Sequence, residues 1–132
     1  MLIQNARIFT MEGQDYARGC IRIADGKIEA VAETLSLLPD EEILDAEGLT
    51  VMPGMVDAHC HVGLYNYGLG AEGSGTNEMV TPMTPQLSAI DSINPRNSIM
   101  SDSYEAGVTT ICTGPGSANL IGGTFTVIKT VG

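Results

Sequence analysis

The stretch Pro53-Gly54-Met55-Val56-Asp57-Ala58-His59-Cys60-His61 contains the only two histidines of the 132-residue chain. If residues 55–61 form a strand, successive side chains alternate between its two faces, so His59 and His61 project from the same face. Their Cα atoms would lie about 6.6–6.8 Å apart, from two rises of about 3.3–3.4 Å. Two imidazoles at that spacing can bind one metal ion, because Zn–N bonds are about 2.0–2.1 Å long. The stretch therefore predicts two metal ligands on one strand.

The rest of such a site is not evident in the sequence. A catalytic zinc ion usually has three protein ligands and a water molecule, and the chain has no third histidine. Cys60 would point to the opposite face, which makes it a poor third ligand, and it has no base partner to act as a nucleophile. Asp57 shares the face of the histidines and could orient an imidazole, or could bond amides at the strand end instead. For the two histidines, the alternative role is to bond backbone carbonyl groups at the edge of the core.

The composition limits the fold and the partners. Hydrophobic residues make up 43% of the chain, aromatic residues only 5%, and there are 16 glycines, which favours strands and turns over a helical bundle. A net charge of -10 would repel nucleic-acid phosphates and anionic lipids. The sequence has no apolar run long enough to span a membrane and no basic start of a signal peptide. The three widely spaced cysteines are expected to be reduced core thiols, as in a cytoplasmic protein.

Residues 1–52 are predicted to form a small antiparallel sheet. The Asp25-Gly26 step between two alternating segments is a strong signal for a hairpin. Residues 42–46 and 49–52 are predicted to form a further strand pair that turns at Glu47-Gly48. The first three strands are expected over residues 2–10, 19–23 and 27–32.

Residues 53–132 have a different organisation. A buried strand is expected over 55–61, then a long loop over 62–83, and a helix that starts at Asn94-Pro95 and stops near Gly107. A second strand follows over 108–113, and the order strand, helix, strand predicts a right-handed βαβ crossover and a parallel sheet. A third strand is expected over 124–129. Because a parallel sheet needs cover on both faces, we expect further sequence or another chain to complete the fold.

Several polar side chains outside the histidine pair could contribute to a site. Ser117 and Asn119 follow the strand over 108–113 and could contact a substrate, although turn capping is favoured. Tyr65 and Tyr67 lie in the long loop and could either cover a substrate or pack the loop. Lys129 could be a carbamylated metal ligand, but an edge-strand role is favoured.

Four segments resemble the amidohydrolase superfamily, especially its imidazolonepropionase-like and prolidase-like members. "LIQNARIFT" and "IRIADGKIEAVAE" resemble the strands of that family's amino-terminal β-sandwich. "DAEGLTVMPGMVDAHCHVG" resembles the entry into the first barrel strand, with the His-x-His metal pair. "YEAGVTTICTGPGS" is similar to the first barrel helix and second strand, and "ANLIGGTFTVIKT" to a segment found after that strand in some members. The resemblance covers essentially the whole chain, but only the opening portion of a complete enzyme.

The resemblance implies an α/β fold with two parts. Residues 1–52 would be part of an antiparallel β-sandwich, and residues 53–132 the first βαβ unit of an incomplete (β/α)8 TIM barrel. The function implied is hydrolysis of C–N bonds in amides, cyclic amides or amidines by a metal-activated water. His59 and His61 would bind the divalent metal, zinc first, with iron, nickel or manganese as alternatives. The other ligands and the proton-accepting aspartate would come from later strands, so the chain alone is expected to be inactive.

Two other functions are compatible with the same residues. A non-enzymatic metal-binding or assembly module could bring His59 and His61 of two chains together at a symmetric interface, where four imidazoles suit zinc. An open fragment could also self-associate through unpaired strand edges. For the complete enzyme we expect a small-molecule substrate, a homo-oligomer, and neither nucleic acid nor membrane as a partner.

Overall fold

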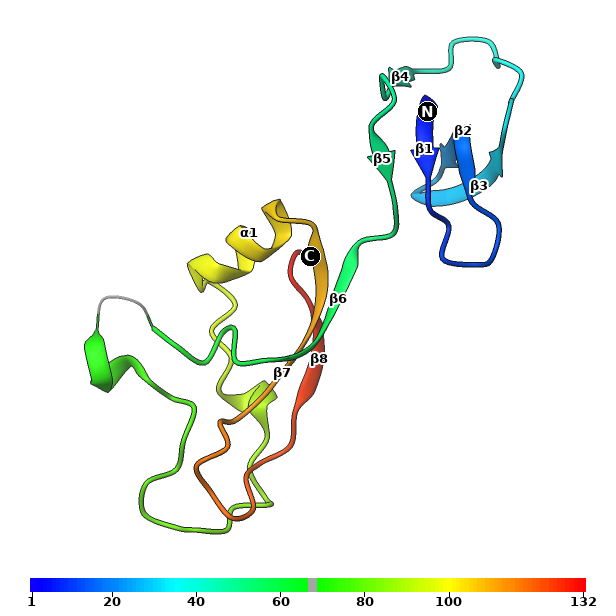
Figure 1. The fold of residues 1–132 in the computed structure, drawn as a ribbon. Helices are drawn as coiled ribbons and strands as arrows, with labels where there is room; N and C mark the ends of the chain where they lie inside the picture. The colour runs from blue at the N-terminus through cyan, green and yellow to red at the C-terminus, as the bar shows by residue number, and fades with distance from the viewer. Residues whose placement is uncertain (67–68) are drawn as a thin grey trace. The chain divides into compact units, whose positions relative to one another are not determined.

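The computed structural model describes residues 1–66 and 69–132. The chain divides into two units, Met1–Pro53 and Gly54–Gly132, each with its own sheet (Figure 1). No helix within the described parts is long and apolar enough to cross a membrane.

The first unit is built on a five-stranded sheet. β1 pairs antiparallel with β2, and β2 pairs antiparallel with β3, as the alternating sequence predicts. The predicted hairpin at Asp25-Gly26 is confirmed, because Ala24 pairs with Lys27 and both turn residues have positive φ, 50° and 71°. Positive φ at both central positions is what a type I′ turn requires. The strands are β1 (Leu2–Ile8), β2 (Tyr16–Ala24), β3 (Lys27–Ala32), β4 (Ile43–Asp45) and β5 (Thr50–Val51).

Two strands and the turn at Glu47-Gly48 form within residues 42–52 as predicted, but the prediction that these strands pair with each other is wrong. Both β4 and β5 run parallel to β1, with Leu2 opposite Ile43 and Arg7 opposite Thr50. Between the two strands, the amides of Ala46 and Gly48 donate to carbonyl groups of β1. Residues 43–51 therefore bond along the free edge of β1. The sheet contains both parallel and antiparallel pairs, and is not purely antiparallel as predicted.

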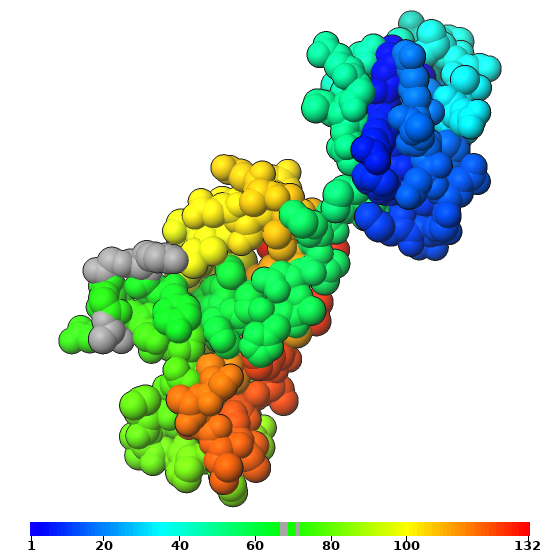
Figure 2. Space-filling model, in the orientation of Figure 1, coloured from blue at the N-terminus to red at the C-terminus, as the bar shows by residue number. Residues whose placement is uncertain are grey.

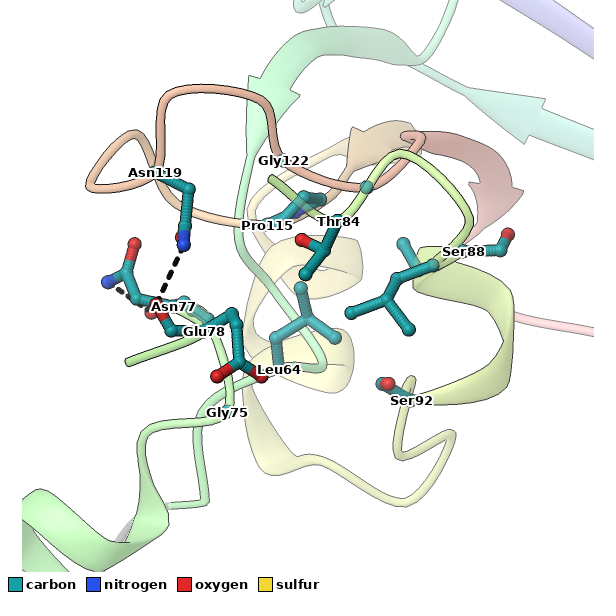
Figure 3. Close-up of a pocket in the computed structure, with 14 residues that line it drawn as sticks. Leu64, Gly75, Asn77, Glu78, Thr84, Ser88, Ser92, Pro115, Asn119 and Gly122 are labelled. Atoms are coloured by element: carbon teal, nitrogen blue, oxygen red, sulfur yellow. Dashed lines mark hydrogen bonds between the residues drawn. The ribbon is translucent and has the colours of Figure 1, made fainter. Parts of the chain in front are cut away.

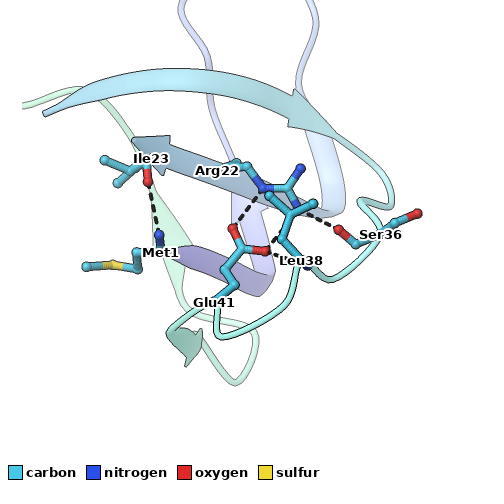
Figure 4. A network of polar contacts seen from close by, with 6 residues as sticks. All are labelled: Met1, Arg22, Ile23, Ser36, Leu38 and Glu41. Carbon is cyan, nitrogen blue, oxygen red and sulfur yellow. Dashed lines mark hydrogen bonds and ion pairs between the residues drawn. The ribbon is translucent and has the colours of Figure 1, made fainter. Parts of the chain in front are cut away.

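An ion pair fastens the connection between β3 and β4 to the sheet (Figure 4). Arg22 Nε lies 2.8 Å from Glu41 Oε1, and the two side chains are only 13% and 5% exposed. The hydrogen bond from Arg22 lowers the pKa of the Glu41 carboxyl below its ordinary value, and the amide of Leu38 adds to the effect. Beneath the strands, the core of this unit consists of Ala6, Ile8, Ile21 and Ala46.

The second unit contains the predicted βαβ order. β6 (Met55–Cys60) pairs parallel with β7 (Val108–Thr113), and α1 (Ser98–Glu105) lies between them in sequence and packs on β7 (Figure 1). The long connection before α1 is largely irregular and includes the short 3-10 helices η1 (Gly70–Gly73) and η2 (Ala89–Asp91). The third strand, β8 (Thr126–Lys129), is antiparallel to β7. The second sheet therefore has one parallel and one antiparallel pair.

The helix begins later than predicted. Asn97, not Asn94, is its N-cap, and its side chain accepts a hydrogen bond from the amide of Ile99. Asn94 instead accepts from the amide of Arg96 and caps a turn ahead of the helix. The predicted stop at Gly107 agrees with the structure, since α1 ends at Glu105 and Gly107 has a φ of 88°.

The prediction that β6 is buried is wrong. Met55 is 44% exposed and Val56 is 65% exposed. β6 is the edge strand of a sheet with the order β6-β7-β8, so only one side of it is paired. Its apolar sequence is typical of a strand covered on both faces, and the described residues leave much of it open to solvent.

Candidate functional site

The two histidines lie on the same side of the chain at the end of β6. His59 is in the strand, Cys60 is the last strand residue, and His61 directly follows it. Their ring centroids are 5.5 Å apart, and the rings are nearly perpendicular at 82°. This is the arrangement expected from side-chain alternation along an extended chain. The two imidazoles are therefore close enough to act on one bound species.

The imidazole of His61 is oriented by a backbone carbonyl group. Its Nδ1 lies 2.6 Å from the carbonyl oxygen of Gly114, the residue that follows β7. Because a carbonyl oxygen can only accept, Nδ1 donates in this bond, and in the neutral imidazole Nε2 is then the nitrogen that has the lone pair. Metal-binding histidines commonly donate their second ring N–H in this way. The same bond also fits the alternative role, in which the histidine only bonds a carbonyl group.

An aromatic ring covers the pair. The Phe125 ring centroid is 4.9 Å from that of His59 and 6.3 Å from that of His61. Phe125 directly precedes β8, so the antiparallel return of the chain brings it back to the end of β6. Sequence reasoning missed this residue. Its position within the strand predicted over residues 124–129 was the available signal, but the direction of that strand was not predicted.

Asp57 bonds a backbone amide, which is the alternative to orienting an imidazole. Its carboxylate accepts a hydrogen bond of 3.1 Å from the backbone amide of His59. Within residues 1–66 and 69–132, no hydrogen bond joins this carboxylate to an imidazole ring. Orientation of a histidine by Asp57 stays a prediction.

The remaining donors are not gathered around the histidines. Across the two described ranges, no group of three or more His, Cys, Asp or Glu side chains is placed to hold a metal ion. Lys129 lies on β8, where its exposed ammonium group donates to the Thr110 hydroxyl at 2.9 Å. Two imidazoles, one with a free Nε2, suit a divalent transition metal. The donor set thus fits part of a metal site.

The predicted loop residues have different environments. The Asn119 amide donates to the carbonyl oxygens of Glu78 and Thr81, at 2.7 Å and 3.2 Å, which is a capping role. Asn119 also lines a cavity of about 130 Å³ (Figure 3). Ser117 is exposed. The Tyr65 hydroxyl accepts from the Thr76 hydroxyl at 3.3 Å, and Tyr67 lies outside the described residues.

Comparison with known proteins gives similar chains but no matching protein-family model. Amidohydrolase tasK of Hapsidospora irregularis is 37% identical over 114 residues, which cover 85% of this chain and 11% of that protein. A 5'-deoxyadenosine deaminase of Methanococcoides burtonii is 39% identical over 66 residues, 48% of this chain and 15% of that protein. The crystal structure of an amidohydrolase from Thermotoga maritima superposes with a TM-score of 0.88 and 38% identity, covering 99% of this chain and 34% of that one. The chain thus spans about a third of this solved relative and less of the two curated ones.

Proposed function

The chain belongs to the amidohydrolase superfamily, of which it matches an amino-terminal portion, and on this premise we propose that it carries the first part of a metal-dependent hydrolase site. The names of its relatives, amidohydrolase and deaminase, are those of hydrolases that act on C–N bonds. We propose that the complete protein likewise hydrolyses a C–N bond, in an amide, a cyclic amide or an amidine.

The observation that carries the proposal is the pair of imidazoles at the end of β6. Their ring centroids are 5.5 Å apart, and His61 is held through Nδ1 so that Nε2 is available. His59 and His61 would hold a divalent ion, with zinc favoured and iron, nickel or manganese as alternatives. When bound, such an ion supplies a Lewis acid and lowers the pKa of a coordinated water to about 7.

The proposal includes a barrel around this site. The parallel pairing of β6 with β7 and the intervening α1 support their being the first two strands of a (β/α)8 barrel. In such barrels the active site lies at the carboxyl ends of the strands, which is where the histidine pair stands on β6. All strands of a (β/α)8 barrel are parallel, whereas β8 is antiparallel to β7. β8 would therefore be an additional strand next to β7. Residues 1–52 would belong to a β-sandwich and residues 53–132 to the barrel.

We expect residues 1–132 alone to be inactive. The described residues supply two imidazoles and no grouped third ligand, and the proton acceptor of the reaction would have to come from elsewhere. The complete enzyme would act on a small molecule as a cytoplasmic homo-oligomer, without nucleic acid or membrane as a partner.

Zinc titration of the chain tests the metal site. We expect weak binding of one Zn²⁺ that is lost in both His59→Asn and His61→Asn. Cys60→Ser is the matched control, since Cys60 lies between the two ligands and by alternation points away from them. Zinc binding that survives both histidine substitutions would contradict the proposal.

Sedimentation separates the enzyme from the assembly module. A chain whose mass is unchanged by zinc supports a half site completed by other sequence. Dimerisation that requires both zinc and the two histidines would favour the non-enzymatic module instead.

A further inference from the structure

The second unit has a cavity that the histidine pair does not explain. Its walls come from Leu64 and from segments 75–78, 84–92 and 115–123, and its volume is about 130 Å³ (Figure 3). An engineered cavity of about 150 Å³ in another protein binds benzene. The space therefore suits a compact group of about six non-hydrogen atoms.

The cavity walls are held together by backbone hydrogen bonds. On one side the amide of Gly116 donates to Thr76 at 2.7 Å, and on the other the amide of Thr84 donates to Ile121 at 2.8 Å. Figure 2 shows the two segments, yellow-green and orange, lying against each other. Backbone hydrogen bonds thus fix the walls of the cavity, a feature that suits the largely pre-formed sites of small molecules.

One wall presents a hydroxyl group that lacks a partner. Thr84 is only 4% exposed and lines the cavity. Among the residues that the structure describes, its hydroxyl makes no hydrogen bond, although its amide and carbonyl groups are both bonded. No fully buried side-chain polar atom among the described residues lacks a partner, so this hydroxyl is open to the cavity, and a ligand that bonds it gains a hydrogen bond.

The cavity carries a single negative charge. Glu78 is the only charged residue among the described residues that line it. Glu78 Oε1 accepts from the amides of Val80 and Thr81, at 2.6 Å and 3.3 Å, which fixes the carboxylate while Oε2 has no hydrogen bond within the described ranges. A fixed carboxylate without a neighbouring cation favours a positively charged ligand and repels an anion.

The lining mixes further polar side chains with apolar ones, and two of its apolar residues connect to the histidines. Leu64, Leu87 and Pro115 give hydrocarbon surface. The amide of Leu64 donates to the carbonyl group of His61, and Pro115 follows Gly114, whose carbonyl group holds the His61 ring. The cavity and the histidine pair are therefore built on the same two loops.

We propose that this cavity binds a compact aliphatic group that carries a positive nitrogen centre of the amidinium type. The hydrocarbon part lies on Leu64, Leu87 and Pro115, and the nitrogen groups bond Glu78 and Thr84. Resting on the proposed function, this group is part of the substrate that the histidine site acts on.

Three probes with one carbon skeleton test the assignment: isobutyramidine, isobutyramide and isobutyrate. Each is titrated into the 15N-labelled chain while amide resonances are followed. We expect saturable shifts confined to the cavity segments, with isobutyramidine about 3–10-fold tighter than isobutyramide and no binding of isobutyrate. Binding of isobutyrate as tight as that of isobutyramidine, or no saturation by any probe, would overturn the proposal.

Substitutions test whether the probes bind to the Glu78 carboxylate and the Thr84 hydroxyl. Glu78→Gln should remove the preference for the amidine over the amide, and Glu72→Gln, an exposed acid on the same connection, should keep it. Thr84→Val should weaken both probes several-fold. If it fails to fold, Gly122→Val replaces it: a Cβ on Gly122 meets its nearest atom at 3.5 Å, and the larger side chain fills the space. A Gly122→Val chain that binds isobutyramidine normally would place the probe elsewhere.

The double variant His59→Asn/His61→Asn separates this proposal from the function. It should lose zinc but bind isobutyramidine like the unsubstituted chain. If no probe binds while zinc binding still depends on both histidines, the cavity assignment fails and the metal site stands. If the probes bind and zinc does not depend on the histidines, the cavity remains and the hydrolase proposal fails.

Discussion

Gly114 lies so close to the ring of Phe125 that a Cβ added to the glycine would come within 2.3 Å of the ring. The carbonyl oxygen of the same glycine is 2.6 Å from His61 Nδ1. One residue thus orients an imidazole and, by having no side chain, admits the ring that packs on His59. The loop after β7 therefore contributes to the positions of both histidine rings.

Gly114→Ala is expected to disturb both contacts. The Cβ displaces the Phe125 ring or shifts the carbonyl group, and zinc affinity falls about 10-fold, in line with loss of a group that orients a ligand. Overpacking also lowers the free energy of unfolding by about 1–3 kcal/mol. Zinc titration and urea denaturation measure the two effects. Gly122→Ala, whose Cβ has ordinary contacts, is the control, and equal zinc affinity of the two variants would refute the role of Gly114.

Phe125→Ala removes the ring next to His59. Because the ring centroids are 4.9 Å apart, loss of the ring current should shift the His59 side-chain proton resonances, and those of His61 less, at 6.3 Å. Phe125 is 36% exposed, so the cost in stability should stay below the about 3–5 kcal/mol of a fully buried Phe. Phe9→Ala in the first unit is the control for a general effect. Unchanged histidine resonances in Phe125→Ala would contradict the packing.

Thr113→Val tests how the end of β7 is tied to the turn after His61. Thr113 is fully buried, and its hydroxyl donates to the carbonyl group of Val62 at 2.7 Å. Its loss leaves that carbonyl group unpaired and should lower the free energy of unfolding by about 1–3 kcal/mol in urea denaturation. The cross-strand partner Thr126 has no hydroxyl hydrogen bond among the described residues, so Thr126→Val should cost much less. Equal costs would mean that the bond does not contribute.

The ion pair of Arg22 and Glu41 predicts a dependence of stability on pH. The pKa of Glu41 is lowered in the folded chain, chiefly by the Arg22 hydrogen bond, so its stabilisation is fully present above the unfolded value, about 4.3. It is lost as the pH falls through the folded pKa, when the carboxylate takes up a proton. Glu41→Gln should therefore lower Tm at pH 7, and the difference should shrink below about pH 4. Glu12→Gln is an exposed control that should change Tm little at either pH; a Glu41→Gln deficit independent of pH would contradict the linkage.

The sequence by itself determined the features that depend on near neighbours. Positive φ at Asp25-Gly26, the helix stop at Gly107, the order of β6, α1 and β7, and the shared side of His59 and His61 all follow from turn chemistry and side-chain alternation. Each needs only a few consecutive residues, so no distant contact can easily change it.

Only the tertiary structure decided which segments lie together. β4 and β5 pair with the edge of β1, and the antiparallel β8 brings Phe125 next to His59. The cavity around Thr84 likewise needs residues 115–123 to return to residues 75–92. Strand pairing and burial depend on which free edge or face a segment meets in space, and local pattern does not encode that choice. For the same reason the apolar β6 was expected to be buried, yet it stands at an open edge.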